Sequence, residues 1–181
     1  MGRLIEIIHV SAGGRIDPVD WAVPYLDDEH AAYASAQLFA ADALLLGRRT
    51  YEGLSAAYPA MHPSPFVDRM NAIPKYVASR TLALAAWNAT VIRGDVARFV
   101  AELKGRSDRN LVKYGNGSLD VALMEHGLVD EIHMLLTPVA VGKGRGMFEA
   151  MEGAVQLRLA EVRPFRSGVV LLVYTPPPGR I

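Results

Sequence analysis

Short apolar runs alternate with longer amphipathic segments along the whole chain. A short apolar run that ends in glycine or a polar turn predicts a buried strand, whereas a longer periodic segment with capping residues predicts a helix. We expect strands at 4–10, 43–46, 75–79, 89–93 and 110–115, and within the late segments 130–142, 155–165 and 168–176.

The helices are expected between these strands, at 28–40, 95–104 and 118–126. Asp95 is the expected N-cap of the second helix, and Gly105 and Gly127 are expected to follow the ends of the second and third. The proline-rich segment 56–66 is expected to be a loop. Alternating strands and helices favour an α/β fold whose sheet is covered by helices on both faces, and the late strands favour a partly antiparallel region.

Composition places the chain among single-domain globular proteins. It has 181 residues, of which 51% are hydrophobic and 21% charged, so one domain over 1–176 is expected, with 177–181 as a disordered tail. Nineteen basic residues balance nineteen acidic ones, which argues against nucleic-acid or membrane partners. No apolar run is long enough to span a bilayer, and the first residues do not resemble a signal peptide, so a cytoplasmic protein is expected.

The residue types present also narrow the chemistry. The chain has no cysteine and five histidines, and the histidines are not spaced as metal ligands, so neither disulfides nor a metal site are expected. A serine-hydrolase nucleophile motif is absent.

Three predicted strands end in residues that suit an anion. The stretch 41–54 runs from an apolar strand through Gly47 into Arg48, Arg49 and Thr50. Ligands of open α/β sheets bind beyond such carboxyl ends, and adjacent guanidinium groups favour a phosphate. A solvated basic turn remains the alternative for this stretch.

Two further strand ends repeat the pattern. Strand 110–115 leads through Gly115, Asn116 and Gly117 into a helix start at Ser118, where free N–H groups favour phosphate. Strand 75–79 ends in Ser79 and Arg80, which by themselves also fit an ordinary surface turn. Three such ends together favour a phosphorylated dinucleotide.

The stretches 41–54, 70–82, 111–149 and 167–176 resemble the dihydrofolate-reductase-like family. The closer resemblance is to its branch related to the C-terminal reductase domain of the bifunctional riboflavin-biosynthesis deaminase-reductase, here in stand-alone form. The resemblance implies a three-layer fold with a mixed, mostly parallel sheet and NADPH lying across the strand ends.

The resemblance assigns four groups of residues to NADPH. Gly47, Arg48, Arg49 and Thr50 would meet the pyrophosphate and 2′-phosphate side, and Ser79, Arg80, Thr81 and Leu82 the adenosine end. Gly115, Asn116, Gly117, Ser118 and Leu119 would cradle the pyrophosphate, and Val10, Ser11, Ala12 and Ile16 would lie near the nicotinamide.

Two departures from the family pattern bear on the substrate. Ala31 stands where dihydrofolate reductases carry a pterin-orienting acid, and the loop after the first strand lacks the usual aspartate. The proton-donor candidates that remain are Asp17, Glu29 and His30.

These residues predict an NADPH-dependent reductase that transfers a hydride to a small heterocyclic substrate resembling a riboflavin precursor or a pterin. The alternative is a non-catalytic NADPH- or ligand-binding protein that retains the reductase fold. We expect the substrate pocket between segments 11–21 and 58–66. The apolar late strands predict a homodimer, although strands buried within one chain would show the same pattern.

Overall fold

The computed structural model describes residues 1–177 and contains one eight-stranded sheet with the strand order β4-β3-β2-β5-β1-β6-β8-β7. The strands are β1 (Leu4–Ser11), β2 (Ala41–Gly47), β3 (Lys75–Ala78), β4 (Ala89–Ile92), β5 (Asn110–Tyr114), β6 (Glu131–Thr137), β7 (Arg158–Pro164) and β8 (Val170–Thr175). All neighbours from β4 to β6 pair in parallel, whereas β8 pairs antiparallel with both β6 and β7.

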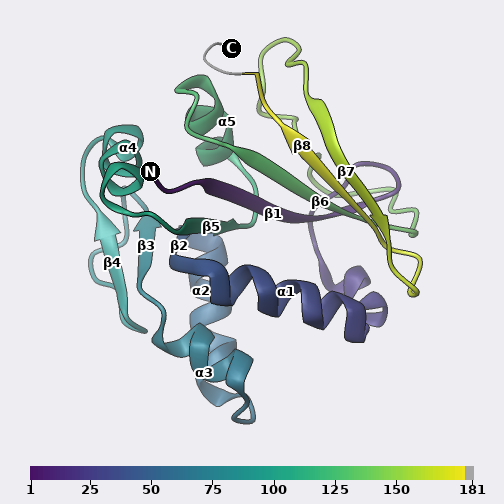
Figure 1. Ribbon diagram of the computed structural model, residues 1–181, viewed down its shortest axis with the longest axis horizontal. Helices are drawn as coiled ribbons and strands as arrows, with labels where there is room; N and C mark the ends of the chain where they lie inside the picture. Colours follow the sequence, from purple (N-terminus) through teal and green to yellow (C-terminus); the bar gives the residue numbers. More distant parts are fainter. Residues whose placement is uncertain (178–181) are drawn as a thin grey trace.

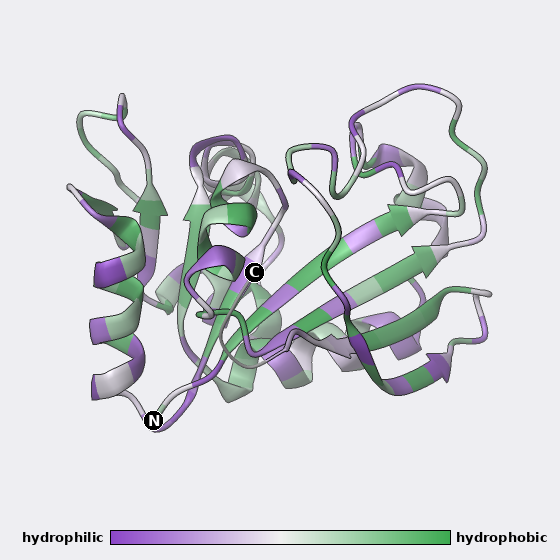
Figure 2. Cartoon of the chain, turned by 90° about the horizontal axis from the view of Figure 1, so that it is seen from above, coloured by the Kyte–Doolittle hydropathy of each residue, from purple (hydrophilic) through white to green (hydrophobic). Residues whose placement is uncertain are grey.

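Helices cover both faces of this sheet (Figure 1). They are α1 (Asp28–Ala40), α2 (Arg48–Ala57), α3 (Pro65–Ala72), α4 (Val96–Arg106) and α5 (Ser118–Glu125), with 3₁₀ turns η1 (Asp20–Tyr25) and η2 (Tyr58–Ala60). One core lies between the sheet and α1, α2 and α3, and a second between the sheet and α4 and α5. Figure 2 shows the central strands as largely hydrophobic, as burial on both faces of a sheet requires.

The architecture confirms the predicted mixed, mostly parallel three-layer fold with an antiparallel C-terminal region. Helix α1 has the predicted bounds, because Asp27 caps it by accepting a hydrogen bond from the His30 N–H. Asp95 caps α4 in the same way through the Arg98 N–H, as predicted. The tail predicted at 177–181 lies, except for residue 177, outside the described residues.

Two local predictions were wrong. Helix α4 does not end before Gly105 but continues to Arg106, and the buried Lys104 ammonium anchors its last turn by donating to the Leu128 carbonyl at 2.7 Å. The segment 56–66 is not only a loop, since α3 begins in it at Pro65. Ser64 caps α3 through the Val67 N–H, which is an N-cap followed by proline at the first helical position.

The apolar late strands are largely used within the chain. Strands β6 and β8 lie inside the sheet, and Leu135, Leu171 and Val173 belong to the core beneath α1. The edge strand β7 is exposed along its whole length, with Leu159 49% and Val162 53% exposed. The homodimer therefore stays a prediction, and the strands on which it was based, β6 and β8, have neighbours on both sides within the sheet.

Within residues 1–177, none of the helices combines the length and the apolar character that crossing a bilayer would need.

Candidate functional site

A cavity of about 770 Å³ opens at the carboxyl ends of the parallel strands. Ile7, Ile8 and His9 of β1 line it, together with the turns that follow β2 and β5. The carboxyl ends of parallel strands meet at one edge of the sheet, which is where ligands of open α/β folds bind. The cavity is therefore the candidate site.

Two glycine turns come together in this cavity. Ile7 of β1 and Leu46 of β2 are both register partners of Tyr114, so the turns at Gly47 and Gly115 follow neighbouring strand ends. A methyl group at Gly115 would overlap the Thr50 hydroxyl, and Gly115 has a φ of +77°. Glycine is therefore required there for both conformation and space.

The glycines leave the space that a phosphorylated dinucleotide needs. A Cβ added to Gly47 would meet no atom within 4 Å, although the residue lines the cavity. At Gly117, the N-cap of α5, an added Cβ would approach the Arg145 Nη1 at 3.2 Å. The first N–H groups of a helix lack acceptors within it and favour anions, so this cradle fits a pyrophosphate.

Arg48 and Arg49 form the first turn of α2 and line the cavity. The Arg48 guanidinium donates to the Glu52 carboxylate and to the Thr81 hydroxyl, each at 2.6 Å. Within residues 1–177, Arg49 makes no ion pair, so its exposed guanidinium is available to an anion.

The segment after β3 reaches the cavity only through Arg48. The Ser79 hydroxyl accepts from the N–H groups of Thr81 at 3.3 Å and Leu82 at 3.0 Å, which shapes the turn. Thr81 then contacts Arg48, but the lining does not include residues 79–82, and Arg80 is exposed.

The first loop contributes less than predicted. Val10 and Ser11 are buried within the sheet, and the Ser11 hydroxyl accepts from the Arg15 N–H at 3.0 Å. Ala12 is exposed and bonds Val139 through its N–H at 2.9 Å. Of the four loop residues assigned to the cofactor, Ile16 is the one that lines the cavity.

Asp17 is paired with Arg145, which the sequence motifs did not assign to the site. The Arg145 guanidinium bonds the Asp17 carboxylate at 3.1 and 3.2 Å, and both residues line the cavity. The Ile16 N–H donates to the Arg145 carbonyl at 3.0 Å and the Met147 N–H to the Gly14 carbonyl at 3.1 Å, so two distant loops are joined. The site therefore has a third arginine, beside Gly117.

A pair of histidines lies at the strand end of β1. The Nε2 atoms of His9 and His30 are 3.3 Å apart, and both rings line the cavity. Burial and the neighbouring His30 lower the pKa of His9 to about 4. Burial also lowers the pKa of His30, although Asp27 opposes the shift. Both rings are thus neutral at neutral pH, and one donates its proton to the other.

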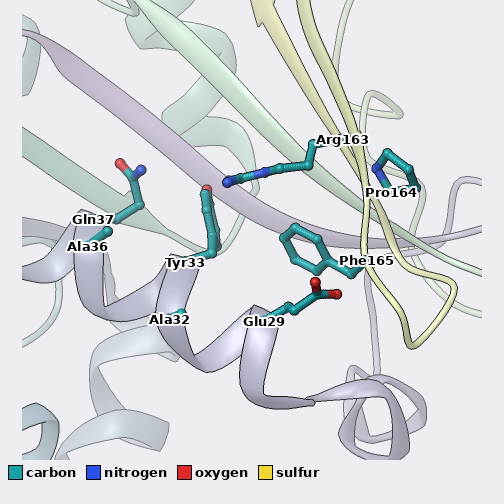
Figure 3. A pocket seen from close by; sticks show the side chains of 8 residues that line it. All are labelled: Glu29, Ala32, Tyr33, Ala36, Gln37, Arg163, Pro164 and Phe165. Carbon is teal, nitrogen blue, oxygen red and sulfur yellow. The ribbon is translucent and has the colours of Figure 1, made fainter.

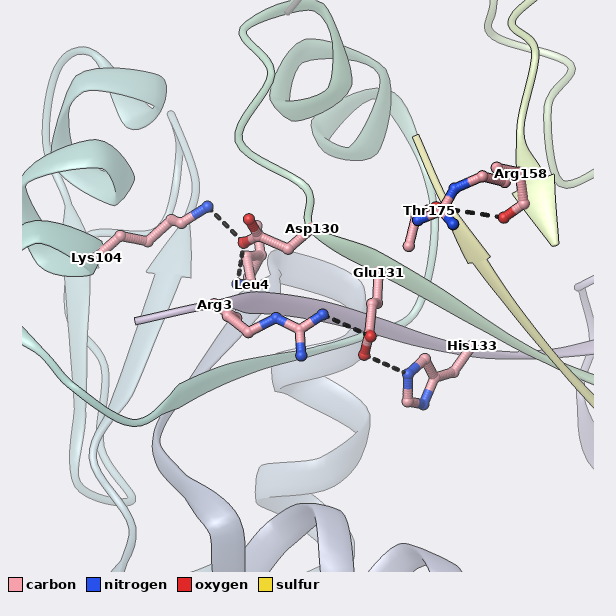
Figure 4. A network of polar contacts seen from close by, with 8 residues as sticks. All are labelled: Arg3, Leu4, Lys104, Asp130, Glu131, His133, Arg158 and Thr175. Atoms are coloured by element: carbon pink, nitrogen blue, oxygen red, sulfur yellow. Dashed lines mark hydrogen bonds and ion pairs between the residues drawn. The ribbon is translucent and has the colours of Figure 1, made fainter. Parts of the chain in front are cut away.

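A second polar chain leads from the cavity across the sheet. Tyr33 lines the cavity and its hydroxyl lies 2.7 Å from the His133 Nδ1. Figure 4 shows His133 bonded to Glu131, which Arg3 holds from the other side, at 3.0 and 2.5 Å respectively. Because Glu131 accepts, His133 carries its proton on Nε2, and Tyr33 donates to Nδ1. This chain fixes the Tyr33 ring.

Glu29 does not line the large cavity. It belongs to a smaller hollow of about 400 Å³ between α1 and β7, where Arg163 lies over the rings of Tyr33 and Phe165 (Figure 3). Its carboxylate accepts from the Arg166 N–H at 2.5 Å. Glu29 is thus placed away from the site that holds Asp17 and His30.

The cavity brings together many, but not all, of the residues assigned from the sequence. Those that line it are Ile16, Asp17, His30, Gly47, Arg48, Arg49, Thr50, Gly115, Asn116, Gly117, Ser118 and Leu119. The sequence reading missed His9, Tyr33, Lys113, Asp120 and Arg145. Within residues 1–177, no group of three or more acidic or histidine side chains is arranged to hold a metal ion.

The predicted substrate pocket has a counterpart in the same cavity. Segment 11–21 contributes Ile16, Asp17 and Val19, and segment 58–66 contributes Tyr58 and Phe66. The two segments therefore border one space, in which aromatic and apolar side chains lie next to the histidine pair.

Comparisons with known proteins agree with the resemblance seen in the sequence motifs. The model of the RibD C-terminal domain family matches residues 8–171. The uncharacterized protein YyaP of Bacillus subtilis (strain 168) is 28% identical over 181 residues, which cover 95% of this chain and 94% of YyaP.

Solved structures show the same fold. A putative riboflavin biosynthesis protein from Shewanella sp. PV-4 has a TM-score of 0.78 at 17% identity, covering 97% of this chain and 99% of that one. A dihydrofolate reductase from Enterococcus faecalis, solved as a complex with NADP(H), has a TM-score of 0.68 at 16% identity, covering 97% and 96%. These likenesses confirm the dihydrofolate-reductase-like architecture.

Proposed function

The chain belongs to the RibD C-terminal domain family, and from this premise we propose that it is an NADPH-dependent reductase of a small heterocyclic substrate. One observation carries the proposal: a single cavity holds a glycine and arginine cradle for phosphates and, at the end of β1, a pair of neutral histidines. A dinucleotide and a small ring fit these two ends.

The proposed contacts with NADPH are made mainly to its phosphate groups. The Gly115–Leu119 loop and the N-terminus of α5 would hold the pyrophosphate, and Arg48 and Arg49 the 2′-phosphate. Residues Ser79–Leu82 would support the adenosine end through the bond between Thr81 and Arg48. Bound NADPH supplies a hydride from C4 of its nicotinamide.

The chain's own residues orient the substrate and supply a proton. Tyr58 and Phe66 offer apolar ring faces to a flat heterocycle. His30, hydrogen-bonded to His9, would donate to the nitrogen or oxygen of the polarised C=N or C=O group that accepts the hydride. Asp17, the other proton-donor candidate that lines the cavity, would not donate the proton but would hold Arg145 in position through their ion pair.

The histidine pair predicts a pH dependence of turnover. The pKa of His9 is about 4, and that of His30 is also lowered from its ordinary value. The proton that would make the histidine pair positively charged is therefore bound at acidic pH and is lost as the pH rises through the lowered pKa range of the pair. We expect kcat/KM to increase on acidification between about pH 8 and pH 5. A pH profile with a saturating cofactor measures it, and a flat profile would contradict the role of the pair.

The proposal itself is tested with purified protein and a panel of pterins, flavin precursors and aldehydes. We expect NADPH binding, and oxidation of NADPH in the presence of at least one heterocyclic compound, followed by cofactor fluorescence. Tight binding without oxidation across the panel would favour the non-catalytic binder. Absence of binding would refute both.

A further inference from the structure

Three ionisable side chains are buried together beneath the glycine loop that follows β5. Glu6 of β1 and Lys113 of β5 are each 2% exposed and are register partners on the same face of the sheet. Asp120, in the first turn of α5, is 1% exposed. A buried charged group is costly unless it is paired and hydrogen-bonded, so this cluster calls for a physical reason.

The cluster holds both ends of the turn at 115–117. The Lys113 ammonium donates to the Gly115 carbonyl at 2.8 Å and to the Asp120 carboxylate at 2.5 Å. The other Asp120 oxygen accepts from the Gly117 N–H at 2.6 Å. One ion pair therefore fixes a carbonyl at the start of the turn and an N–H at its end.

The same pair balances charge where an anion would bind. Asp120 places a carboxylate in the first turn of α5, on which a pyrophosphate would lie under the proposed function, and Lys113 neutralises it at contact distance. Without Lys113, the carboxylate would oppose the bound anion in a region of low dielectric constant, where such repulsion is strong.

Glu6 completes the cluster without a hydrogen bond to the glycine loop. Burial raises the pKa of Glu6 well above its ordinary value, and Asp120 raises it further, with Lys113 opposing. The raised pKa favours the uncharged form of Glu6, and within residues 1–177 neither of its carboxyl oxygens has a hydrogen-bond partner, so the ion pair of the cluster is that of Lys113 with Asp120.

We propose that the buried Lys113–Asp120 pair positions the 115–118 loop for the cofactor pyrophosphate and cancels the charge that would otherwise repel it. This inference rests on the proposed function. Lys113 and Asp120 act through the loop backbone as positioning residues, and Glu6 gives a matched control inside the same cluster.

The first test compares NADPH affinity by titration in Lys113→Met, Lys113→Met/Asp120→Asn and Glu6→Gln. Lys113→Met leaves an unpaired carboxylate under the loop and is expected to weaken NADPH about 10- to 100-fold. The added Asp120→Asn removes that carboxylate and should restore most of the affinity, whereas Glu6→Gln should bind like the unaltered protein. A purely structural role would make the double variant no better than Lys113→Met, and that result would overturn the proposal.

The second test needs no cofactor and separates the two proposals. In the ligand-free protein, Asp120→Ala removes the acceptor of the Gly117 N–H, and hydrogen exchange of that amide should accelerate about tenfold, with the amides of β1 unchanged. An unchanged Gly117 rate would overturn the positioning role. If the unaltered protein binds no NADPH while the exchange result holds, the proposed function fails and the control of the loop by Asp120 stands. If it binds NADPH and Lys113→Met binds equally well, the inference fails alone.

Discussion

His30→Gln is expected to lower kcat roughly 10²–10⁴-fold, the usual contribution of a positioned general acid, with little change in NADPH affinity. Glutamine keeps a hydrogen-bonding group beside His9 but cannot carry the additional proton. His30 stands on α1, where its Nε2 lies 3.3 Å from that of His9, and it is not one of the residues of the glycine turns, so cofactor binding should not depend on it. Steady-state turnover on a compound identified with the panel, together with an NADPH titration, measures both effects.

Glu29→Gln is the matched control for this variant. Glu29 is the preceding residue on α1, but it faces the smaller hollow, and glutamine can still accept from the Arg166 N–H. Its kcat should stay near that of the unaltered protein. Unchanged turnover in His30→Gln would remove His30 from the chemistry and leave Asp17 as the remaining proton-donor candidate that lines the cavity.

Arg49→Ala is expected to weaken NADPH binding about 10- to 100-fold, because a hydrogen bond to a charged group contributes about 1.5–3 kcal/mol. NADH lacks the 2′-phosphate and should bind almost as before. Arg48→Ala should show a smaller loss, since Glu52 and Thr81 already occupy that guanidinium. Added salt should reduce the difference, because both arginines are exposed.

Arg98→Ala provides the control for lost positive charge. Arg98 is exposed on α4, on the opposite face of the sheet, where it pairs with Glu102 at 3.1 Å. It should leave both affinities unchanged. If single replacements of Arg48, Arg49 and Arg80 each weakened NADPH and NADH equally, 2′-phosphate recognition by these arginines would be refuted.

The strands and helices α1, α4 and α5 were predicted because their signals are local, whereas α2, which begins directly after Gly47, was not predicted. Apolar runs closed by glycine identified β2 and β5, and Asp95 identified the start of α4. Helix α3 was not predicted, because the prolines of 56–66 were interpreted as loop signals. Ser64 followed by Pro65 is, however, also typical of a helix N-terminus. Gly105 was interpreted as the end of α4, but the Lys104 ammonium bonds Leu128 and Asp130 in the loop before β6, and α4 continues past Gly105.

The candidate site was predictable where one short motif contains the whole feature. The motifs at 47–50 and 115–119 line the cavity because each follows a parallel strand. His9 and His30 are 21 positions apart, and their proximity depends on how α1 packs on β1. Lys113 is a charged residue within an apolar strand, and its burial becomes intelligible only from the position of Asp120 on α5, with which it forms an ion pair. Arg145 lines the cavity because backbone hydrogen bonds join its loop to the distant loop that contains Gly14 and Ile16.

A parallel titration of the unaltered protein with NADPH and NADH tests most directly whether the cavity is a site for a phosphorylated nicotinamide cofactor. Two charge-assisted hydrogen bonds to the 2′-phosphate predict about a hundredfold preference for NADPH. Gly47→Val should abolish that binding, since its side chain would enter the space at the strand end where an added Cβ meets no atom within 4 Å. Equal affinity for the two cofactors, or NADPH binding that Gly47→Val leaves intact, would contradict the assignment.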